Sequence, residues 1–279
     1  MLKRANIRLD INDETKSILE HDIPVFIAAN HKSMWETAGI PLILHKEFDR
    51  KVISGAGQQL FDGLSKKFMN FGTTFDIQKD KKASSIKLID DITSKLDNYE
   101  SVLVFPEGTR SRDGHLANYK SSVFEAPIQS KRPVIIIPAD VTYPKIPELE
   151  LFSSNSKYSF KPSDIKYLAA KLNPVTISFG KPLYNRHFSN RKELSKSAQE
   201  QAKSLVHVHP TNIYALAFVD NETTLGSSID DTIQKLSQNT DRFTHLPSKF
   251  FTLQNKQINL NIPDSQLNFY ANQVRHYLK

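Results

Sequence analysis

Short apolar runs of strand length alternate along this chain with stretches that carry apolar residues at helical spacing. Residues 23–29 read IPVFIAA, a run that predicts one buried strand. Residues 84–98 place isoleucine and leucine three or four positions apart, which predicts an amphipathic helix. The same two patterns predict further strands at residues 6–11, 52–56, 73–77, 101–105, 134–137 and 175–179, and further helices at residues 36–45, 61–71 and 192–207.

Strands that alternate with helices predict an α/β fold, with a mixed, largely parallel sheet flanked by helices. A chain of 279 residues is long enough for one such domain and a smaller appendage. We place the main domain at residues 1–208 and a small, mainly helical C-terminal appendage at residues 209–279. The appendage contains six Lys and Arg against six Asp and Glu, so the net charge of +7 lies entirely in the main domain.

A basic domain suits partners that carry phosphate, such as a phospholipid surface, an acidic carrier, a nucleotide or a nucleic acid. A solvated basic face with no partner is the alternative. The chain has no cysteine, which excludes disulfides, zinc–thiolate sites and thiol nucleophiles. No apolar run predicts a signal peptide or a spanning helix. We therefore expect a cytoplasmic protein that meets any lipid substrate as a peripheral protein on the membrane surface.

The stretch NHKSMWE at residues 30–36 places a histidine and a carboxylate close together between a predicted strand and a predicted helix. His31 would lie just before the helix, at the mouth of the sheet. Glu36, five positions later, can bind one ring nitrogen of His31, which fixes the tautomer and raises the basicity of the other nitrogen. A capping box made by Ser33 and Glu36 at the start of the helix is the simpler alternative.

The stretch FPEGTRS at residues 105–111 follows another predicted strand and offers groups that bind anions. Gly108 lets the backbone approach a ligand closely, and Thr109 offers a hydroxyl. Arg110 offers a planar fork suited to phosphate, and Lys120 lies further along the same loop. A tight turn with surface charges is the alternative interpretation of this stretch.

Functional sites of α/β sheets gather at the carboxyl ends of the strands. His31, residues 107–109 and Lys79 each follow a predicted strand. We therefore expect these three positions to converge on one rim of the sheet.

Together, these residues resemble the glycerolipid acyltransferase family, which includes lysophosphatidate and glycerol-3-phosphate acyltransferases. Its first block, NHxSxxD, is NHKSMWE here, an HX4E motif with Glu36 in place of the usual aspartate, and its third block, FPEGTRS, is unchanged. The second block usually ends in an arginine, where this chain has Lys79, which keeps the charge but loses the bidentate fork. The fourth block resembles residues 133–138, and residues 209–213 and 267–276 are similar to segments downstream of the catalytic domain in glycerol-3-phosphate and dihydroxyacetone-phosphate acyltransferases.

The resemblance implies an O-acyltransferase of phospholipid biosynthesis, which moves a fatty acyl group from acyl-CoA or acyl-carrier protein to a hydroxyl. The favoured acceptor is 1-acyl-sn-glycerol-3-phosphate, which would become phosphatidic acid. The resemblance also implies that His31 is the general base and that Glu36 orients it, with no metal and no bound cofactor. The residues that would bind the acceptor and shape its pocket are Lys79, Glu107, Gly108, Thr109, Arg110 and Lys120.

Three other functions stay open. The C-terminal segments favour glycerol-3-phosphate as the acceptor. A nucleic-acid-binding module would use the basic domain, but the chain has no recognisable binding motif and no interleaving of aromatic and basic residues, so we expect no nucleic-acid partner. A lipid-surface binding protein without catalysis is the third. His207 and His209 have no third metal ligand at suitable spacing, so we expect surface or packing roles for them.

Overall fold

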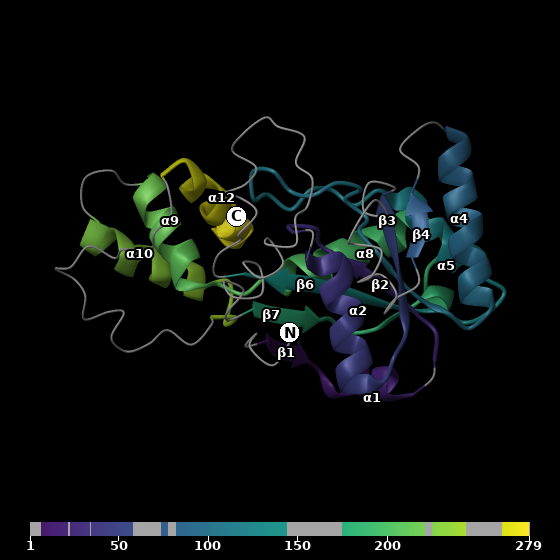
Figure 1. Cartoon of the computed structure of the whole chain (residues 1–279). Helices are drawn as coiled ribbons and strands as arrows, with labels where there is room; N and C mark the ends of the chain where they lie inside the picture. Colours follow the sequence, from purple (N-terminus) through teal and green to yellow (C-terminus); the bar gives the residue numbers. More distant parts are fainter. Residues whose placement is uncertain are drawn as a thin grey trace, which may run out of the picture.

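The computed structural model describes residues 7–21, 23–33, 35–57, 74–77, 82–143, 175–220, 225–243 and 264–278. Within these ranges, eight strands form one sheet in the order β1-β7-β6-β2-β5-β3-β4, with β8 paired to β6 (Figure 1). The strands are β1 (Ile7–Ile11), β2 (Val25–Ala29), β3 (Val52–Gly57), β4 (Thr74–Ile77), β5 (Ser101–Val104), β6 (Ile135–Thr142), β7 (Val175–Phe179) and β8 (Leu183–Tyr184). All neighbouring pairs are parallel except β6–β7 and β6–β8. The predicted mixed, largely parallel sheet is therefore confirmed.

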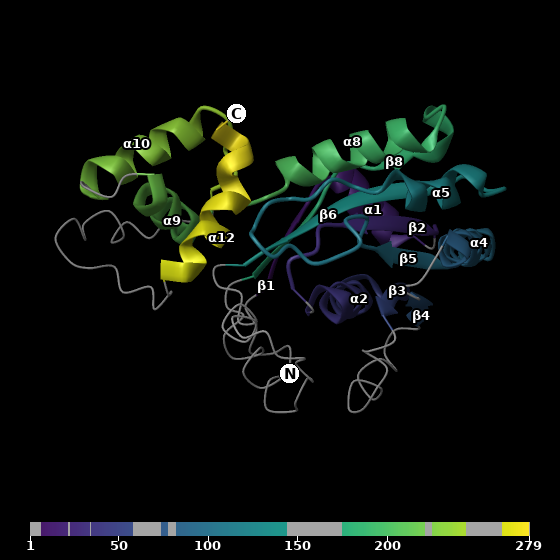
Figure 2. The ribbon, with the colours of Figure 1, turned by 90° about the horizontal axis from the view of Figure 1, so that it is seen from above.

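Helices cover both faces of this sheet (Figure 2). Alternate residues of β2 point to opposite faces, so Ile27 packs in one cluster with α1 and α2, and Phe26 packs in another with α4, α5 and α8. The main-domain helices are α1 (Asp13–Glu20), α2 (Trp35–Phe48), α4 (Lys82–Asp97), α5 (Glu125–Gln129) and α8 (Arg191–Ser204), with short 3₁₀ turns η4 (Ser121–Phe124) and η5 (Asn185–His187). The sheet therefore lies between two helical layers, as expected for an α/β fold.

Three further helices lie together beside the sheet: α9 (Pro210–Asp220), α10 (Leu225–Ser237) and α12 (Asp264–Val274), which continues into the 3₁₀ turn η6 (Arg275–Leu278) (Figure 1). The predicted C-terminal helices are thus present. Their buried residues Leu216 and Tyr270 belong to the same apolar cluster as Ile137 of β6 and Leu44 of α2. The helices share a core with the sheet, and the domain boundary at residue 208 stays a prediction. Among the helices of the described ranges, none is both long and apolar enough to cross a bilayer.

Strand β6 is longer than the sequence predicts, because it runs through Pro138 to Thr142. The prediction ended this strand at residue 137 because proline has no N–H to donate to a ladder. Pro138 lies where the neighbour of β6 changes, since β8 pairs with Ile135 and Ile136 and β7 pairs from Ala139 onward. The missing donor therefore falls between two ladders. The added residues bring Asp140 and Thr142 into the buried sheet.

Helix α1 was not predicted, although Asn12 caps it by accepting a hydrogen bond from the N–H of Thr15 (2.9 Å). Helix α2 begins at Trp35 and continues through Pro41 to Phe48, beyond its predicted end. The predicted helix at residues 61–71 lies outside the described residues.

Arg50 closes the carboxyl end of α1. Its guanidinium donates to oxygens of nearby segments, and the residue is 7% exposed. The acceptors include the carbonyls of Ile18 (3.1 Å), Leu19 (3.1 Å), His21 and Ile23 (2.5 Å) and the hydroxyl of Ser101 (3.0 Å). The last carbonyls of a helix have no partner within the helix, so a buried cation at this end satisfies several of them at once.

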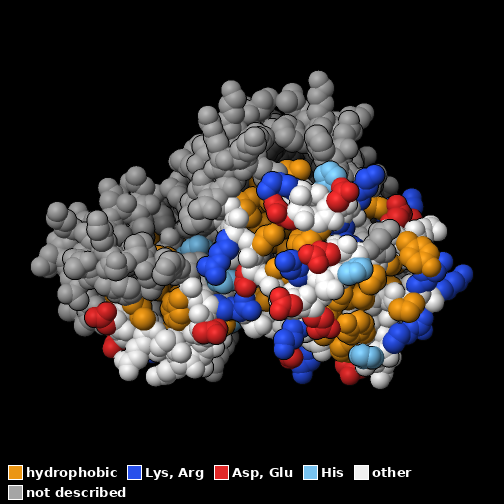
Figure 3. Space-filling view, turned by 90° about the horizontal axis from the view of Figure 1, so that it is seen from below, with side chains coloured by type: hydrophobic (Ala, Val, Ile, Leu, Met, Phe, Trp, Pro, Cys, Tyr) orange, Lys and Arg blue, Asp and Glu red, His pale blue; other side chains and the backbone are white. Residues whose placement is uncertain are grey.

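The face in Figure 3 has lysine and arginine side chains interspersed with aspartate and glutamate. On this face the excess positive charge of the chain is not gathered into one patch.

His209 precedes α9 and is buried, with 2% of its surface exposed, so the expectation of a packing role is confirmed. Burial, together with the charges of the nearby His207 and Lys32, lowers the pKa of His209 to about 3. An unfolded chain binds this proton near pH 6.5 and the folded chain does not. The stability that the neutral ring contributes is therefore present above about pH 6.5 and is lost as the pH falls toward 3.

We expect His209→Gln to remove this dependence. Between pH 7 and pH 5 the free energy of unfolding of the unmodified protein should fall by about 2 kcal/mol relative to the variant. Urea unfolding at the two pH values measures the difference. His115 is exposed, so the free energy of unfolding of His115→Gln should change between the two pH values as it does in the unmodified protein. If His209→Gln differed from the unmodified protein by the same amount at both pH values, the assignment to His209 would be wrong.

Candidate active site

The carboxyl end of β2 is fixed by Asn30, which is 1% exposed. Its backbone N–H donates to the carbonyl of Ala139 on β6 (3.1 Å). Its side-chain N–H donates to Asp140 (2.9 Å), and its side-chain oxygen accepts from the hydroxyl of Tyr119 (2.8 Å). The next residue, His31, therefore leaves the sheet from a rigid position.

His31 and Glu36 form a hydrogen-bonded dyad. The Nδ1 atom of His31 lies 2.9 Å from Oε2 of Glu36, which belongs to the first turn of α2. The His31 side chain is 15% exposed, whereas the Glu36 side chain is fully buried. A carboxylate at Nδ1 makes that nitrogen the donor, so Nε2 is the basic nitrogen of the ring.

The Glu36 carboxylate is also held by the chain around it. Its two oxygens accept from the backbone N–H of Lys32 (3.1 and 2.9 Å), and Oε1 also accepts from the N–H of Ser33 (3.1 Å) and the hydroxyl of Tyr143 (3.2 Å). Ser33 in turn caps α2 by accepting from the N–H of Trp35 (3.0 Å). Glu36 therefore serves both interpretations of this motif: it binds His31 as in a dyad, and it accepts from the N–H of Ser33 at the start of α2 as in a helix cap.

Burial dominates the electrostatics of the dyad. It raises the pKa of Glu36 to about 8, while the charge of Lys32 and the backbone N–H donors act to lower it. The ring of Phe105 stacks on the imidazole of His31, with centroids 4.1 Å apart and planes 19° apart. This contact fixes the plane of the imidazole from the side of the FPEGTRS loop.

The loop formed by residues 105–111 holds the backbone of His31 on both sides. Oε1 of Glu107 accepts from the N–H of His31 (2.8 Å), and the N–H of Ser111 donates to the carbonyl of His31 (2.8 Å). Oε2 of Glu107 accepts from the N–H of Ala117 (3.0 Å). Burial raises the pKa of Glu107 to about 7, and these two N–H donors lower it. Glu107 thus fixes the positions of two segments, and a role in shaping the acceptor pocket stays a prediction.

Gly108 makes the turn of this loop. Its N–H donates to the carbonyl of Phe105 (2.9 Å), and its φ of +74° lies in the left-handed region that favours glycine. A Cβ atom at this position would lie 2.4 Å from Nζ of Lys120, so the Lys120 side chain passes directly over the glycine. The loop therefore carries the Lys120 ammonium against its own turn.

The structure brings together most of the residues that the sequence predicts. Thr109 is exposed, and Arg110 is partly buried and directly precedes Ser111, whose N–H binds the carbonyl of His31. Arg110 and His31 therefore belong to the same rim of the sheet, as predicted. Lys79 lies outside the described residues.

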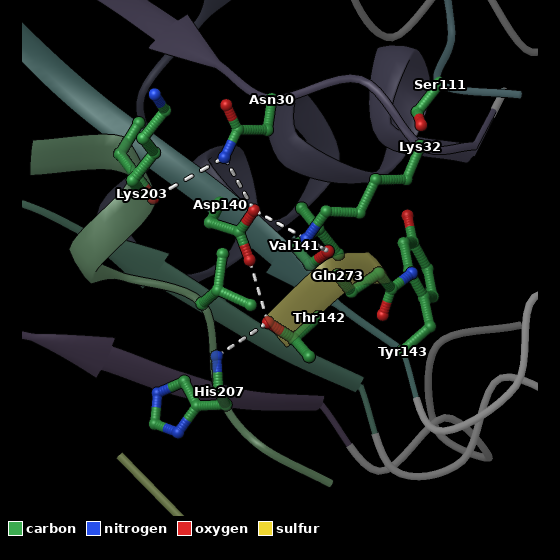
Figure 4. Close-up of polar contacts among 12 residues, drawn as sticks. Asn30, Lys32, Ser111, Asp140, Val141, Thr142, Tyr143, Lys203, His207 and Gln273 are labelled. Carbon is green, nitrogen blue, oxygen red and sulfur yellow. Dashed lines mark hydrogen bonds and ion pairs between the residues drawn. The ribbon is translucent and has the colours of Figure 1, made fainter. Parts of the chain in front are cut away.

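Sequence reasoning missed the buried pair behind the dyad. The ammonium of Lys32 lies 2.7 Å from Oδ1 of Asp140 and donates to the carbonyl of Val141 (3.1 Å) (Figure 4). Oδ2 of Asp140 accepts from the hydroxyl of Thr142 (2.7 Å). Although burial acts to raise it, the Lys32 charge and these hydrogen bonds hold the pKa of Asp140 below its usual value. The available signal was an aspartate inside the otherwise apolar run IIIPADV.

Helix α12 packs directly on the segment that follows the FPEGTRS loop. The side-chain N–H of Asn272 donates to the carbonyl of Asp113 (2.8 Å), and Gly114 lies against the carbonyl of Phe269. Gly114 has a φ of +86°, and a Cβ atom there would lie 1.9 Å from that carbonyl oxygen. Only glycine fits both the backbone conformation and the close approach.

We expect Gly114→Ala to lower the free energy of unfolding by roughly 2–4 kcal/mol, because a left-handed alanine is strained and α12 has to move away. Chemical denaturation measures this loss. His115→Ala, at an exposed neighbouring position, should stay within about 0.5 kcal/mol of the unmodified protein. Equal stability of the two variants would contradict the packing of α12 described here.

Comparisons with known proteins agree with the motifs. Residues 10–141 match the Acyltransferase family model. The chain is 25% identical over 131 residues to 1-acyl-sn-glycerol-3-phosphate acyltransferase beta of Homo sapiens, which covers 46% of this chain and 45% of the human enzyme, less than half its length. It is 25% identical over 209 residues to lyso-ornithine lipid O-acyltransferase of Rhizobium meliloti (strain 1021), which covers 67% of each chain.

Among solved structures, the chain is similar to the 1-acyl-sn-glycerophosphate (LPA) acyltransferase PlsC from Thermotoga maritima, with 20% identity, a TM-score of 0.48, and coverage of 71% of this chain and 70% of that chain. The matched residues 10–141 of the family model include both members of the dyad, the FPEGTRS loop and Asp140. Residues 10–141 thus match the model of the acyltransferase family, the family that the two motifs resemble.

Proposed function

We propose that this chain is an O-acyltransferase that moves a fatty acyl group from a thioester donor to the free hydroxyl of 1-acyl-sn-glycerol-3-phosphate. The observation that carries the proposal is the His31–Glu36 dyad held by the FPEGTRS loop at the carboxyl rim of the sheet. The human relative named for this reaction supports the choice of acceptor. The donor is acyl-CoA or acyl-carrier protein, and the lipid acceptor is met at a membrane surface.

In this mechanism Nε2 of His31 takes the proton of the acceptor hydroxyl as that oxygen attacks the thioester carbonyl. The C–S bond then breaks, and the proton on His31 passes to the departing thiolate. Glu36 holds the ring in the required tautomer and stabilises the imidazolium. In this scheme transfer is direct, and the chain has no cysteine that could form an acyl-enzyme thioester.

Arg110 and Lys120, with Lys79, bind the phosphate of the acceptor. A guanidinium binds phosphate through two parallel hydrogen bonds, and an ammonium adds a point charge. The position of Lys120 against Gly108 and of Arg110 two residues further supports a cationic pocket beside His31.

A second candidate acceptor is lyso-ornithine lipid, which the longer of the two matches favours because it covers 67% of each chain. Glycerol-3-phosphate, favoured by the C-terminal segments, is the third. All three acceptors offer a hydroxyl to the same dyad, so the chemistry at His31 does not change.

The test is a transfer assay on the purified chain. Radiolabelled 1-acyl-sn-glycerol-3-phosphate, glycerol-3-phosphate and lyso-ornithine lipid are each offered with acyl-CoA and with acyl-carrier protein. We expect labelled phosphatidate from the first acceptor. Transfer to another acceptor would reassign the substrate, and no transfer from either donor to any acceptor would reject the activity. Salt-sensitive binding of a plain oligonucleotide without transfer would favour a nucleic-acid-binding protein instead.

A further inference from the structure

Lys32 of the NHKSMWE motif directs its side chain to the carboxyl-terminal part of β6. The side chain is 1% exposed and contacts Asp140 and Val141 of that strand (Figure 4). Its backbone N–H meanwhile donates to both oxygens of Glu36. One residue therefore contacts the dyad carboxylate through its backbone and carries a buried positive charge on its side chain.

A buried ion pair is a poor way to gain stability, because removing two charges from water costs about as much as their attraction returns. The Lys32–Asp140 pair is nonetheless fully enclosed, and Asn30 and Thr142 satisfy further lone pairs of Asp140. The arrangement fixes a positive charge at one defined place beside the dyad. That charge acts on Glu36 more strongly than the opposing charge of Asp140 does.

We propose that Lys32 is a positioning residue for acyl transfer: its backbone N–H orients the Glu36 carboxylate, and its ammonium, anchored on Asp140, supplies the positive charge that keeps this carboxylate available to His31. The proposal rests on the proposed function of the dyad. Lys32 touches no substrate in this scheme and acts through Glu36 alone.

The charge balance around Glu36 explains why such a residue is needed. Burial favours the protonated form of Glu36, and a protonated carboxyl group cannot accept the Nδ1–H of His31 and all of its backbone donors together. The charged and titratable groups that face Glu36 are His31, Lys32, Tyr143, Asp140 and Glu107. Among these groups, Lys32 is the one that brings an ammonium.

The Lys32–Asp140 pair offers a test, because substitutions of its two members should move the pH–rate profile in opposite directions. The dyad binds one proton on the acidic side of its pH–rate profile, and that apparent pKa belongs to the dyad as a unit. Lys32→Met removes the positive charge, so the acidic limb of kcat/KM should move upward by about one pH unit. Asp140→Asn removes the opposing negative charge, so the same limb should move downward. A role confined to folding would lower the rate without moving the limb.

Lys32→Met leaves Asp140 buried without its cation, and that variant can fail to fold. The double variant Lys32→Met with Asp140→Asn removes both charges together and keeps the side-chain volumes. Its limb should lie above that of the unmodified protein and below that of Lys32→Met, because Lys32 is the stronger influence on Glu36. Lys46→Met, at an exposed position on α2, is the control and should leave the profile unchanged.

A second measurement separates this inference from the proposed function. NMR titration of the His31 ring in the same four variants can be measured whether or not the protein transfers acyl groups. The pKa of the ring should move upward in Lys32→Met and in the double variant, move downward in Asp140→Asn, and stay unchanged in Lys46→Met. If the unmodified protein shows no transfer, the proposed function fails while this titration still tests Lys32. If transfer is present and the limb and the ring titration stay in place in Asp140→Asn and in the double variant, the role of Lys32 is rejected. A shift in the same direction for Asp140→Asn and for the double variant rejects it equally, because the proposal expects the first to move downward and the second upward.

Discussion

Replacing His31 with alanine should lower kcat/KM for acyl transfer by roughly 10²–10⁴-fold and leave the fold intact. The imidazole supplies the base for the acceptor hydroxyl, and no other histidine is bonded to Glu36 among the contacts of the described residues. The side chain contacts Glu36 and Phe105, while the bonds that hold this segment use the backbone of residue 31, which alanine retains. Steady-state assays with the labelled acceptor, together with a thermal melt, measure both parts of the prediction.

His45→Ala is the matched control for this experiment. His45 lies on the same helix as Glu36, is 43% exposed and pairs with the exposed Asp49. His45→Ala should leave turnover within about twofold of the unmodified protein. Substitutions at exposed positions rarely change the free energy of unfolding by more than about 0.5 kcal/mol, so the variant stays folded. An unchanged turnover for His31→Ala would end the assignment of His31 as the base.

Arg50→Met should lower the free energy of unfolding by about 3–5 kcal/mol, a large share of the stability of a single domain. The substitution keeps an apolar stem of similar length but removes the guanidinium that donates to the carbonyls at and beyond the end of α1. Each buried acceptor left without a partner costs about 1–3 kcal/mol, and local rehydration offsets part of the total. Urea unfolding followed by circular dichroism gives the difference.

The neighbouring Lys51 provides the comparison, because it has a similar side chain and is exposed. Lys51→Met should change the free energy of unfolding by no more than about 0.5 kcal/mol. The acyl-transfer rate of folded Arg50→Met should stay near that of the unmodified protein, since Arg50 lies at the amino-end side of β2 and the dyad lies beyond its carboxyl end. If the free energy of unfolding of Arg50→Met equalled that of the unmodified protein, water would be replacing the guanidinium at these carbonyls and the prediction would be wrong.

Local sequence signals predicted the parts of this molecule that depend on near neighbours. The apolar runs place β2, β5 and β7, because a strand buried on both faces is mostly apolar. The spacing of His31 and Glu36 predicted their contact, because five positions across the start of a helix bring the two side chains within reach. Pro138 gave the wrong end for β6, because the tolerance of a proline depends on which strands lie beside it.

The rest of the site depends on contacts between segments that are distant in the sequence. Lys32 and Asp140 are 108 residues apart in the sequence, and the hydrophobic periodicity of the two segments does not predict that they form a pair. Glu107 was predicted to shape the acceptor pocket, and its carboxylate accepts from backbone N–H groups of two other segments. A carboxylate that holds the backbone and one that meets a ligand look the same in a motif, so only the three-dimensional arrangement distinguishes them.

The contact of α12 with Gly114 also sets an order of events during synthesis. Asn272 is added 159 residues after Asp113, which at about 5–20 residues per second is a delay of roughly 8–30 s on the ribosome. For that interval the nascent chain contains the whole dyad and the glycine turn but not the helix that packs on them. The rim of the sheet therefore lacks this contact until α12 has been made and packs on it.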